Sequence, residues 1–525
     1  MSESASLDAA AVVSANRTTR NAVSNYIYYG LQALILLTVQ AYVIRSLGKE
    51  HYSIWPVLRS CLNVAALVQI GVGAGAARFL AVAIGQGDEQ RVQKLVGTYL
   101  SATLVGGVIY CSIAGTVAVN LETVFNISSV HATEARWALI VMGISGAVHM
   151  GASVLAAVMT ATQSFLKLNC LRGSLLVARA CVVFASFSIV GPDLVWIALS
   201  HLLVSVAEAV GCVFLARSVL PWLKVTVSGA SWATFREVTT FSVIALVMAI
   251  AGRLYWDTDY LLINRLIDPA MVTGYSIVAT ILLRCTTLTS LGNNAVSAPL
   301  AVLFGRNDIK GIARAVYRAN RAAVPLGAFA MFFLMFFGDH FLTHYAGEEY
   351  QSYSYLFVLF GFGFIVSATQ NLPARIPSVF GKIGIPATMT VLAAVVNLAL
   401  SFALVWGFEL GLTGIAVGTL AMQVLYRASF YPWFVARMLQ EPLHRFCYRT
   451  MVIPVSSCLP AIACMATIRY LSTKGTIIEL LLALGVSGTV HVVCLISIGL
   501  DPVDRKRVLV AFKLAAGRAR AVIAA

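Results

Sequence analysis

The sequence has very little charge. Only 11% of its 525 residues are charged, 59% are hydrophobic, and the mean hydropathy is +0.85. Soluble domains carry about 25% charged residues, so this composition excludes an ordinary soluble protein. It predicts a polytopic membrane protein.

Motifs of enzymes and metalloproteins are also missing. The ten cysteines are scattered along the chain with no C-x-x-C pair, so we expect neither a disulfide framework nor a cysteine metal site. A free cysteine inside a membrane protein behaves instead as a small apolar residue. The phosphate-binding sequence Gly-x-x-x-x-Gly-Lys-Ser/Thr is absent as well, which argues against ATP hydrolysis. We therefore predict no enzyme activity, no catalytic residue, no cofactor and no metal.

Long apolar stretches dominate the chain. A transmembrane helix needs about 20 apolar residues, and about fourteen stretches are long enough, so we predict an all-α fold with about fourteen transmembrane helices. The predicted spans are 22–44, 53–77, 95–119, 137–161, 173–190, 194–217, 239–263, 271–303, 322–342, 353–374, 384–407, 411–436, 450–469 and 475–499. Residues 1–21 have no apolar core, so they predict a disordered cytoplasmic tail rather than a signal peptide.

Lysine and arginine are unevenly distributed between the loops. If the N-terminus is cytoplasmic, the inner segments hold about 26 of these residues and the outer loops about 6, as the positive-inside rule requires. This distribution predicts that both termini are cytoplasmic. It also accounts for the net charge of +15 without a nucleic-acid partner, and the basic loops would contact anionic membrane lipids.

The two halves of the sequence resemble each other. Tyr52-Ser-Ile is echoed by Tyr275-Ser-Ile, and the loop Gly87-Asp-Glu-Gln-Arg is echoed by Asn307-Asp-Ile-Lys about 220 residues later, although such strings also recur by chance in apolar sequence. Six spans in each half predict a parallel repeat about an axis along the membrane normal. The predicted parts are an N-lobe at 22–218, a C-lobe at 238–437, two further helices at 449–499 and a basic cytoplasmic tail at 500–525.

Five arginines lie inside the predicted spans, where a cation is costly unless it faces a wet cavity or a partner. They are Arg59, Arg179, Arg253, Arg284 and Arg427. A cavity through which a large anion passes would explain them, so we predict all five as substrate-binding residues. The alternative for Arg59, Arg179 and Arg427 is that each side chain extends to a nearby interface.

Acidic and imidazole groups inside the spans are candidates for ion coupling. We predict this role for Asp257 and Glu208, because carboxylates in a low dielectric titrate near neutral pH. The alternative for Asp257 is a salt bridge to Arg253, four residues earlier on the same helical face. Glu208 has no charged helical neighbour, so it must find a partner on another span or stay protonated. For His149 and His201 we favour hydrogen-bonded packing over ion coupling.

The order of motifs along residues 20–440 resembles the Wzx-like polysaccharide flippases of the multidrug/oligosaccharidyl-lipid/polysaccharide (MOP) exporter superfamily. The matching segments begin at Ile44-Arg-Ser-Leu-Gly, Gly71-Val-Gly-Ala-Gly, Asp257-Thr-Asp-Tyr, Val272-Thr-Gly-Tyr, Gly347-Glu-Glu-Tyr, Phe380-Gly-Lys-Ile-Gly, Val396-Asn-Leu-Ala and Gly411-Leu-Thr-Gly. The resemblance implies that the chain flips undecaprenyl-pyrophosphate-linked oligosaccharide across a bacterial inner membrane by alternating access. Arginine binds phosphate oxygens bidentately and stays protonated, so Arg59 and Arg284, on equivalent helices, would meet one pyrophosphate from opposite lobes.

The same resemblance implies the partners. They would be the lipid-linked oligosaccharide itself, membrane lipids, and the polymerase and chain-length regulator of a surface polysaccharide such as O-antigen, capsule or exopolysaccharide. One alternative is a multidrug exporter of the same superfamily, which would usually have twelve spans and a less cationic cavity. A membrane-embedded polymerase or ligase is the other alternative. It is disfavoured because the longest predicted outer loops, 120–136 and 343–352, are too short to form a domain.

Overall fold

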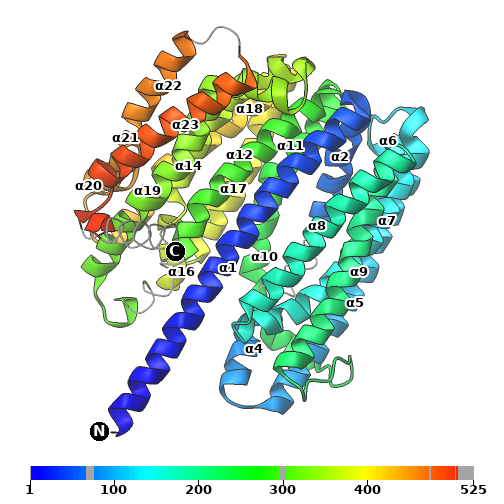
Figure 1. Ribbon diagram of the computed structural model, residues 1–525. Helices are drawn as coiled ribbons and strands as arrows, with labels where there is room; N and C mark the ends of the chain where they lie inside the picture. The colour runs from blue at the N-terminus through cyan, green and yellow to red at the C-terminus, as the bar shows by residue number, and fades with distance from the viewer. Residues whose placement is uncertain are drawn as a thin grey trace, which may run out of the picture. The chain divides into compact units, whose positions relative to one another are not determined.

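The protein is described by a computed structural model, which covers residues 2–66, 76–294, 300, 303–471, 475–502 and 504–506 (Figure 1). The glycine-rich segment at 71–75 and the basic tail from residue 507 lie outside the described residues. Where the chain is described, its regular structure is entirely helical. The chain divides into two compact units, Met1–Thr273 with Thr390–Val395, and Gly274–Met389 with Val396–Ala525. The predicted lobe boundaries at 218 and 238 remain a prediction from the repeat.

The first unit is built from long helices joined by short turns. In chain order its helices are α1 (Ser2–Leu47), α2 (Lys49–Ala65), α4 (Ala76–Gly85), α5 (Glu89–Val119), α6 (Leu121–Val124), α7 (Ser129–Ala161), α8 (Phe165–Ile189), α9 (Leu194–Val219), α10 (Trp232–Trp256), α11 (Thr258–Leu262) and a π-helical turn, Ile263–Ile267. Helix α7 packs against both α5 and α9, and α1 packs against α8.

Helix α12 (Met271–Asn294) crosses the boundary at residue 273, and the second unit continues from it. Its further helices are α14 (Ile309–Tyr345), α15 (Tyr355–Gln370), α16 (Ile376–Val379), α17 (Gly384–Phe402), α18 (Gly411–Met422), α19 (Tyr431–Met438), α20 (Leu443–Cys447), α21 (Ile453–Ser456), α22 (Leu459–Leu471) and α23 (Ile477–Cys494). Short 3-10 segments occupy Glu348–Ser354 and Pro373–Arg375, and π-helical segments occupy Ala403–Gly407, Gln423–Phe430, Tyr448–Val452 and Leu495–Gly499. A core cluster that includes Phe333, Phe337, Met465 and Ala483 joins α14, α22 and α23.

The chain is a polytopic all-α membrane protein. In its described part, ten helices are long and apolar enough to cross a membrane, and they coincide with ten of the fourteen predicted spans. The other four spans also lie on helices, but their described residues are too short or not apolar enough to count as membrane-crossing helices. These are the spans that carry Arg59, Arg253, Arg284 and Arg427.

The N-terminal segment differs from the prediction. Helix α1 begins at Ser2, where the sequence predicted a disordered tail up to residue 21. Residues 1–21 contain neither glycine nor proline and are rich in alanine, the residue with the strongest helix propensity. Because the apolar part of α1 already supplies a helix nucleus, extending it over the tail requires no new nucleation.

Two loops of the repeat have the same local geometry. Asp88 caps the start of α5 and Asp308 caps the start of α14. Each side chain accepts a hydrogen bond from the backbone N–H three residues later, at 2.9 and 2.7 Å. Such a cap satisfies a first-turn donor that has no partner within the helix. The preceding residues, Gly87 and Asn307, have φ of 71° and 56°. Two further pairs of residues with positive φ are also separated by about 220 residues. They are Gln163 with Gly381 and Gly191 with Glu409. This local agreement supports the predicted repeat.

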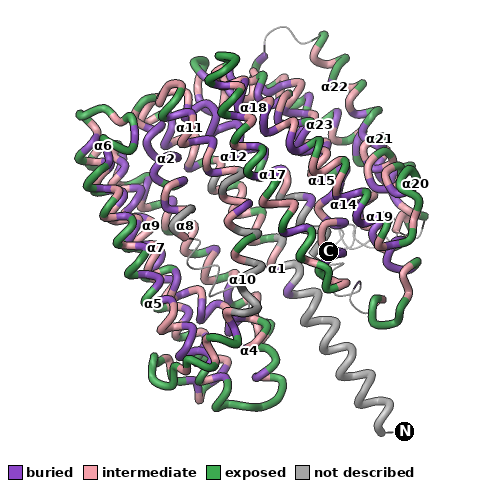
Figure 2. The backbone as a smooth tube through the Cα atoms, turned by 180° about the vertical axis from the view of Figure 1, so that it is seen from behind, coloured by how far each residue is buried: buried purple, intermediate pink, exposed green. Residues whose placement is uncertain are grey.

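Small residues let α5 and α7 approach closely, as is usual where helices pack in a membrane. A Cβ placed on Gly143 would lie 2.7 Å from the Cβ of Ala114, and one on Gly146 would lie 2.3 Å from the ring of Tyr110. On the other side of the bundle, exposed residues run along α5, α7 and α9 (Figure 2). On α9 they form an apolar stripe suited to lipid, made of Leu203, Val206, Val210 and Phe214.

Candidate functional site

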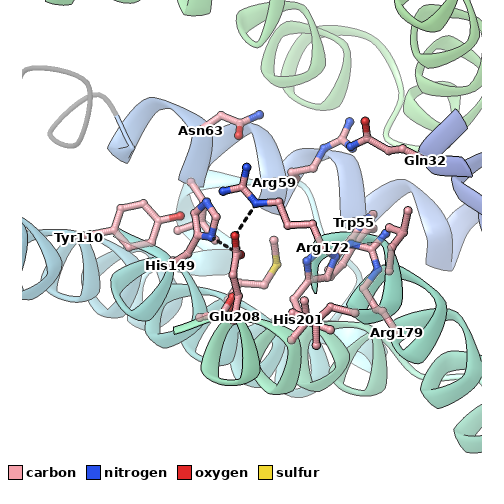
Figure 3. A pocket seen from close by; sticks show the side chains of 18 of the residues that line it. Gln32, Trp55, Arg59, Asn63, Tyr110, His149, Arg172, Arg179, His201 and Glu208 are labelled. Atoms are coloured by element: carbon pink, nitrogen blue, oxygen red, sulfur yellow. Dashed lines mark hydrogen bonds and ion pairs between the residues drawn. The ribbon is translucent and has the colours of Figure 1, made fainter. Parts of the chain in front are cut away.

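A polar cavity of about 550 Å³ lies within the first unit (Figure 3). Helices α1, α2, α5, α7, α8 and α9 all contribute to its wall. Its charged and aromatic lining consists of Tyr28, Trp55, Arg59, Tyr110, His149, Arg172, Arg179, His201 and Glu208, together with the amides Gln32 and Asn63. Three arginines and one glutamate give the lining an excess of positive charge.

Helical periodicity brings these side chains to one wall, because residues three, four or seven apart share a helix face. Arg172 and Arg179 are two turns apart on α8, and His201 and Glu208 are two turns apart on α9. On α2, Trp55, Arg59 and Asn63 follow one another at intervals of one turn. The polar stripe of α9 thus lies opposite its apolar outer stripe.

Glu208 is held by two neighbouring helices. Arg172 Nε donates to Glu208 Oε1 over 2.8 Å, and His149 Nδ1 lies 3.2 Å from Glu208 Oε2. The Glu208 side chain is only 8% exposed, whereas those of Arg172 and His149 are 32% and 46% exposed. The carboxylate therefore holds the Arg172 guanidinium and the His149 imidazole in place at the cavity wall. Its partners come from other spans, as the sequence required.

Arg59 has no such partner among the described residues. Its residue is exposed, and among the described residues it makes no hydrogen bond or ion pair. Arg179 lines the same cavity from α8, and His201 lies beside Trp55 with ring centroids 5.7 Å apart. Figure 3 shows the side chains of Arg59, Arg172 and Arg179 converging from two helices. The guanidinium of Arg59 is thus available to a ligand.

Arg253 and Asp257 form the salt bridge that their spacing allows. Arg253 Nη1 lies 3.2 Å from Asp257 Oδ2 at the end of α10. Asp257 Oδ1 also accepts from the side chain of Asn63 over 3.2 Å, and the Asp257 backbone carbonyl accepts from Ser60 over 2.5 Å. Asn63 lines the cavity, so its hydrogen bond to Asp257 links the ion pair of Arg253 and Asp257 to the cavity wall. An ion-coupling role for Asp257 remains a prediction.

The remaining predicted arginines belong to the second unit. Arg284 is half-buried on α12. Arg427 lies in the π-helical segment before α19, with its guanidinium 5.1 Å from the ring centroid of Tyr431 and 5.7 Å from that of Tyr426. Aromatic faces attract cations, so these rings stabilise the guanidinium where it lies. A substrate-binding role for Arg284 and Arg427 remains a prediction. The cavity of the first unit does not include either residue in its lining.

Several residues that line the cavity, among them Arg172, were not predicted as site residues from the sequence. Arg172 was counted with the cytoplasmic loops because the span was predicted to begin at 173, but α8 begins at Phe165. The seven-residue spacing from Arg172 to Arg179 is the signal that could have placed both on one face. For His149 the prediction of hydrogen-bonded packing agrees with its contact to Glu208. All ten cysteines are free in the structure.

Comparisons with known proteins bear on the fold. No protein-family model matches the chain. A curated relative from Bacillus subtilis (strain 168), described as "Uncharacterized membrane protein EpsK", is 21% identical over 456 residues, which cover 86% of this chain and 90% of that protein. An inward-facing multidrug resistance MATE family transporter of the MOP superfamily matches with a TM-score of 0.67 at 12% identity, covering 79% of this chain and 94% of its own.

Two more solved structures extend this likeness. The eukaryotic MATE transporter AtDTX14 matches with a TM-score of 0.63 at 14% identity, over 84% of this chain and 99% of its own. The lipid II flippase MurJ, in an inward closed conformation, matches with a TM-score of 0.61 at 10% identity, over 89% and 98%. The chain has the fold of MOP superfamily transporters. At these identities the likeness establishes the fold alone, so its activity must be argued from the site.

Proposed function

We propose that this protein flips lipid-linked oligosaccharide, joined to its lipid through a pyrophosphate, across a bacterial inner membrane. The observation that carries the proposal is the cationic cavity of the first unit, where Arg59, Arg172 and Arg179 outnumber the single acidic residue Glu208. An arginine within a membrane-spanning helix is costly unless it faces a wet cavity or a partner, so the convergence of three arginines on one cavity calls for an anionic ligand.

Pyrophosphate suits this cavity chemically. A pyrophosphate diester brings two negative charges that must leave water, and the planar guanidinium forms paired hydrogen bonds with phosphate oxygens. Arg59 offers its guanidinium freely, whereas Glu208 already holds Arg172. Tyr28, Tyr110 and Trp55 add aromatic and hydroxyl groups, which are typical partners for sugar rings and hydroxyls. Arg59 and Arg179 would therefore bind the headgroup, with Arg172 held beside them.

A multidrug exporter is the second candidate, because MATE transporters share the fold with TM-scores up to 0.67. An exporter of organic cations needs an acidic site, since like charges repel in a low dielectric. The excess of arginine in this cavity favours an anion. The likeness to the lipid II flippase MurJ, which covers 89% of this chain, supports lipid-linked substrates further.

The rest of the expected biology follows from this proposal. The protein would lie in the inner membrane with both termini in the cytoplasm, and it would deliver its substrate to a polysaccharide polymerase and a chain-length regulator. It would use no cofactor and catalyse no reaction. Its energy would come from ion coupling through Asp257 or Glu208.

The test is flipping in proteoliposomes with a fluorescent undecaprenyl-pyrophosphate oligosaccharide and an impermeant quencher. Arg59→Ala should slow flipping at least about tenfold, because a charged hydrogen bond contributes about 1.5–3 kcal/mol. Arg59→Lys should retain part of the rate, since lysine keeps the charge but loses the planar fork.

The matched control is Arg265→Ala. Arg265 is exposed, contacts Asn126 Oδ1 over 3.0 Å and lies outside the cavity lining. Equal flipping by Arg59→Ala and Arg265→Ala, at equal reconstitution, would show that the cavity does not bind the headgroup.

A further inference from the structure

Two histidines and a glutamate form a cluster apart from the cavity, where α2 and α7 begin. His51 Nε2 lies 2.6 Å from Glu134 Oε1, and His131 Nδ1 lies 3.6 Å from Glu134 Oε2. The two imidazole rings stack with centroids 4.2 Å apart. One ligand atom from each of the three residues lies within 4.8 Å of the others. None of the three lines the cavity described above.

The local fold places these groups together. His131 and Glu134 are three residues apart in the first two turns of α7, so they share one face of that helix. His51 comes from the first turns of α2. The backbone N–H of Leu194, at the start of α9, donates to Glu134 Oε1 over 2.5 Å. The starts of α2, α7 and α9 therefore meet at the carboxylate of Glu134, and the hydrogen bond from α9 fixes the orientation of that carboxylate.

This set of donors matches a metal site. Zinc binds imidazole nitrogen and carboxylate oxygen at about 2.0–2.2 Å in a tetrahedral arrangement, which separates neighbouring ligand atoms by about 3.3–3.6 Å. His131 Nδ1 and Glu134 Oε2 already have such a separation, 3.6 Å. His51 Nε2 and Glu134 Oε1 are 2.6 Å apart and would move apart when an ion binds between them. In such sites, a backbone group or a carboxylate usually forms a hydrogen bond to a metal-binding side chain and so fixes its orientation. Leu194 N–H supplies that support to Glu134. The carboxyl group of Asp193 lies within hydrogen-bonding reach of Glu134 and would be a second support for it.

The cluster is also accessible. The side chains of His51 and Glu134 are each 15% exposed and that of His131 is 28% exposed. His131 also lines a separate cavity of about 210 Å³ with Glu50 and Asp268, so an ion has an acidic path of entry. A metal site needs such a path as well as ligands.

We propose that His51, His131 and Glu134 bind one Zn²⁺ ion, with water as the fourth ligand. The sequence predicts no metal because its cysteines form no ligand pattern, whereas these ligands are histidine and glutamate from two separate helices. The ion would hold the starts of α2 and α7 together. His51 lies one turn from Trp55 and two turns from Arg59 on α2, so the site stabilises the helix that carries the free arginine of the cavity.

The experiment measures zinc directly on the purified full-length protein after its affinity tag has been removed. Equilibrium dialysis against buffered Zn²⁺, followed by elemental analysis, gives stoichiometry and affinity. Co²⁺ in place of Zn²⁺ gives a visible absorption spectrum that reports tetrahedral ligation. The test variants are His131→Asn and His51→Asn. The matched control is His444→Asn, because His444 is an exposed histidine on α20 in the other unit.

Wild type and His444→Asn should bind one Zn²⁺ per chain, and zinc should raise their Tm. Each test variant should bind zinc at least about 100-fold more weakly, since removing even a supporting residue costs about 10–100-fold. Gel filtration shows whether each variant is folded. The proposal is overturned if folded wild type binds no Zn²⁺, or if zinc binding and the Co²⁺ spectrum persist unchanged in both test variants.

Discussion

The ion pair between Glu208 and Arg172 gives the sharpest prediction for stability. Glu208→Gln keeps the shape of the side chain and removes its charge. Two unit charges about 4 Å apart attract by about 4 kcal/mol at an effective dielectric of about 20. Arg172 is 32% exposed, however, and solvent screens such a pair. Replacing charged hydrogen bonds by neutral ones costs about 1 kcal/mol each, so for the contacts to Arg172 and His149 we expect a loss of about 2 kcal/mol.

The assay is thermal unfolding in detergent, followed by tryptophan fluorescence, for Glu208→Gln, Arg172→Gln and the double variant. Each single variant should lower Tm. The double variant should lower it by less than the sum, because partners in direct contact couple by about 0.5–3 kcal/mol. The control pair is Glu122 and Arg136, which lie 3.2 Å apart but are 53% and 42% exposed. Exposed pairs contribute about 0–1 kcal/mol, so Glu122→Gln should barely change Tm. Additive effects for Glu208 and Arg172 would refute the assignment of Glu208 as the anchor of Arg172.

Three further predictions concern packing, coupling and topology. Gly146→Ala should lower Tm, because its Cβ would lie 2.3 Å from the Tyr110 ring and overpacking costs about 1–3 kcal/mol; Gly151→Ala, with nothing within 4 Å of its Cβ, should leave Tm unchanged or higher. Asp257→Asn should abolish flipping in proteoliposomes at a normal level of folded protein, whereas normal flipping across pH 6 to 8 would reduce its role to packing. Ser128→Cys should react with an impermeant thiol reagent in intact spheroplasts in a cysteine-free background, and reaction only after lysis would invert the proposed orientation.

The fold class was predictable because hydropathy reports burial in lipid directly. The fourteen predicted spans fall on helices that are broken at most by short turns, where they are described, and the salt bridge of Arg253 with Asp257 follows from their spacing of four residues. The loop of Asp88 and its counterpart at Asp308 were likewise visible as a repeat, since a capping aspartate acts on its own turn. These features are local, and a single sequence is sufficient to specify them.

The site was only partly predictable, because it depends on how separate helices pack. Arg59 and Arg179 were proposed from their cost in lipid, but nothing in the sequence pairs Glu208 with Arg172 and His149 rather than with another span. Hydropathy places the start of the span at residue 173, so Arg172 falls outside it. The helix in fact begins at Phe165, because the carboxylate of Glu208 allows an arginine to lie inside it. The contact of Arg427 with two tyrosine rings was similarly hidden until the backbone was known.

The central claim is that the cavity of the first unit binds an anionic headgroup. Isothermal titration calorimetry on the purified protein tests it, with a short-chain polyprenyl-pyrophosphate oligosaccharide and the organic cation ethidium as ligands. The account predicts that the pyrophosphate ligand binds, that Arg59→Ala weakens its binding at least about tenfold, and that Glu208→Gln preserves it. It would be contradicted if ethidium bound more tightly than the pyrophosphate ligand and lost its affinity in Glu208→Gln but not in Arg59→Ala.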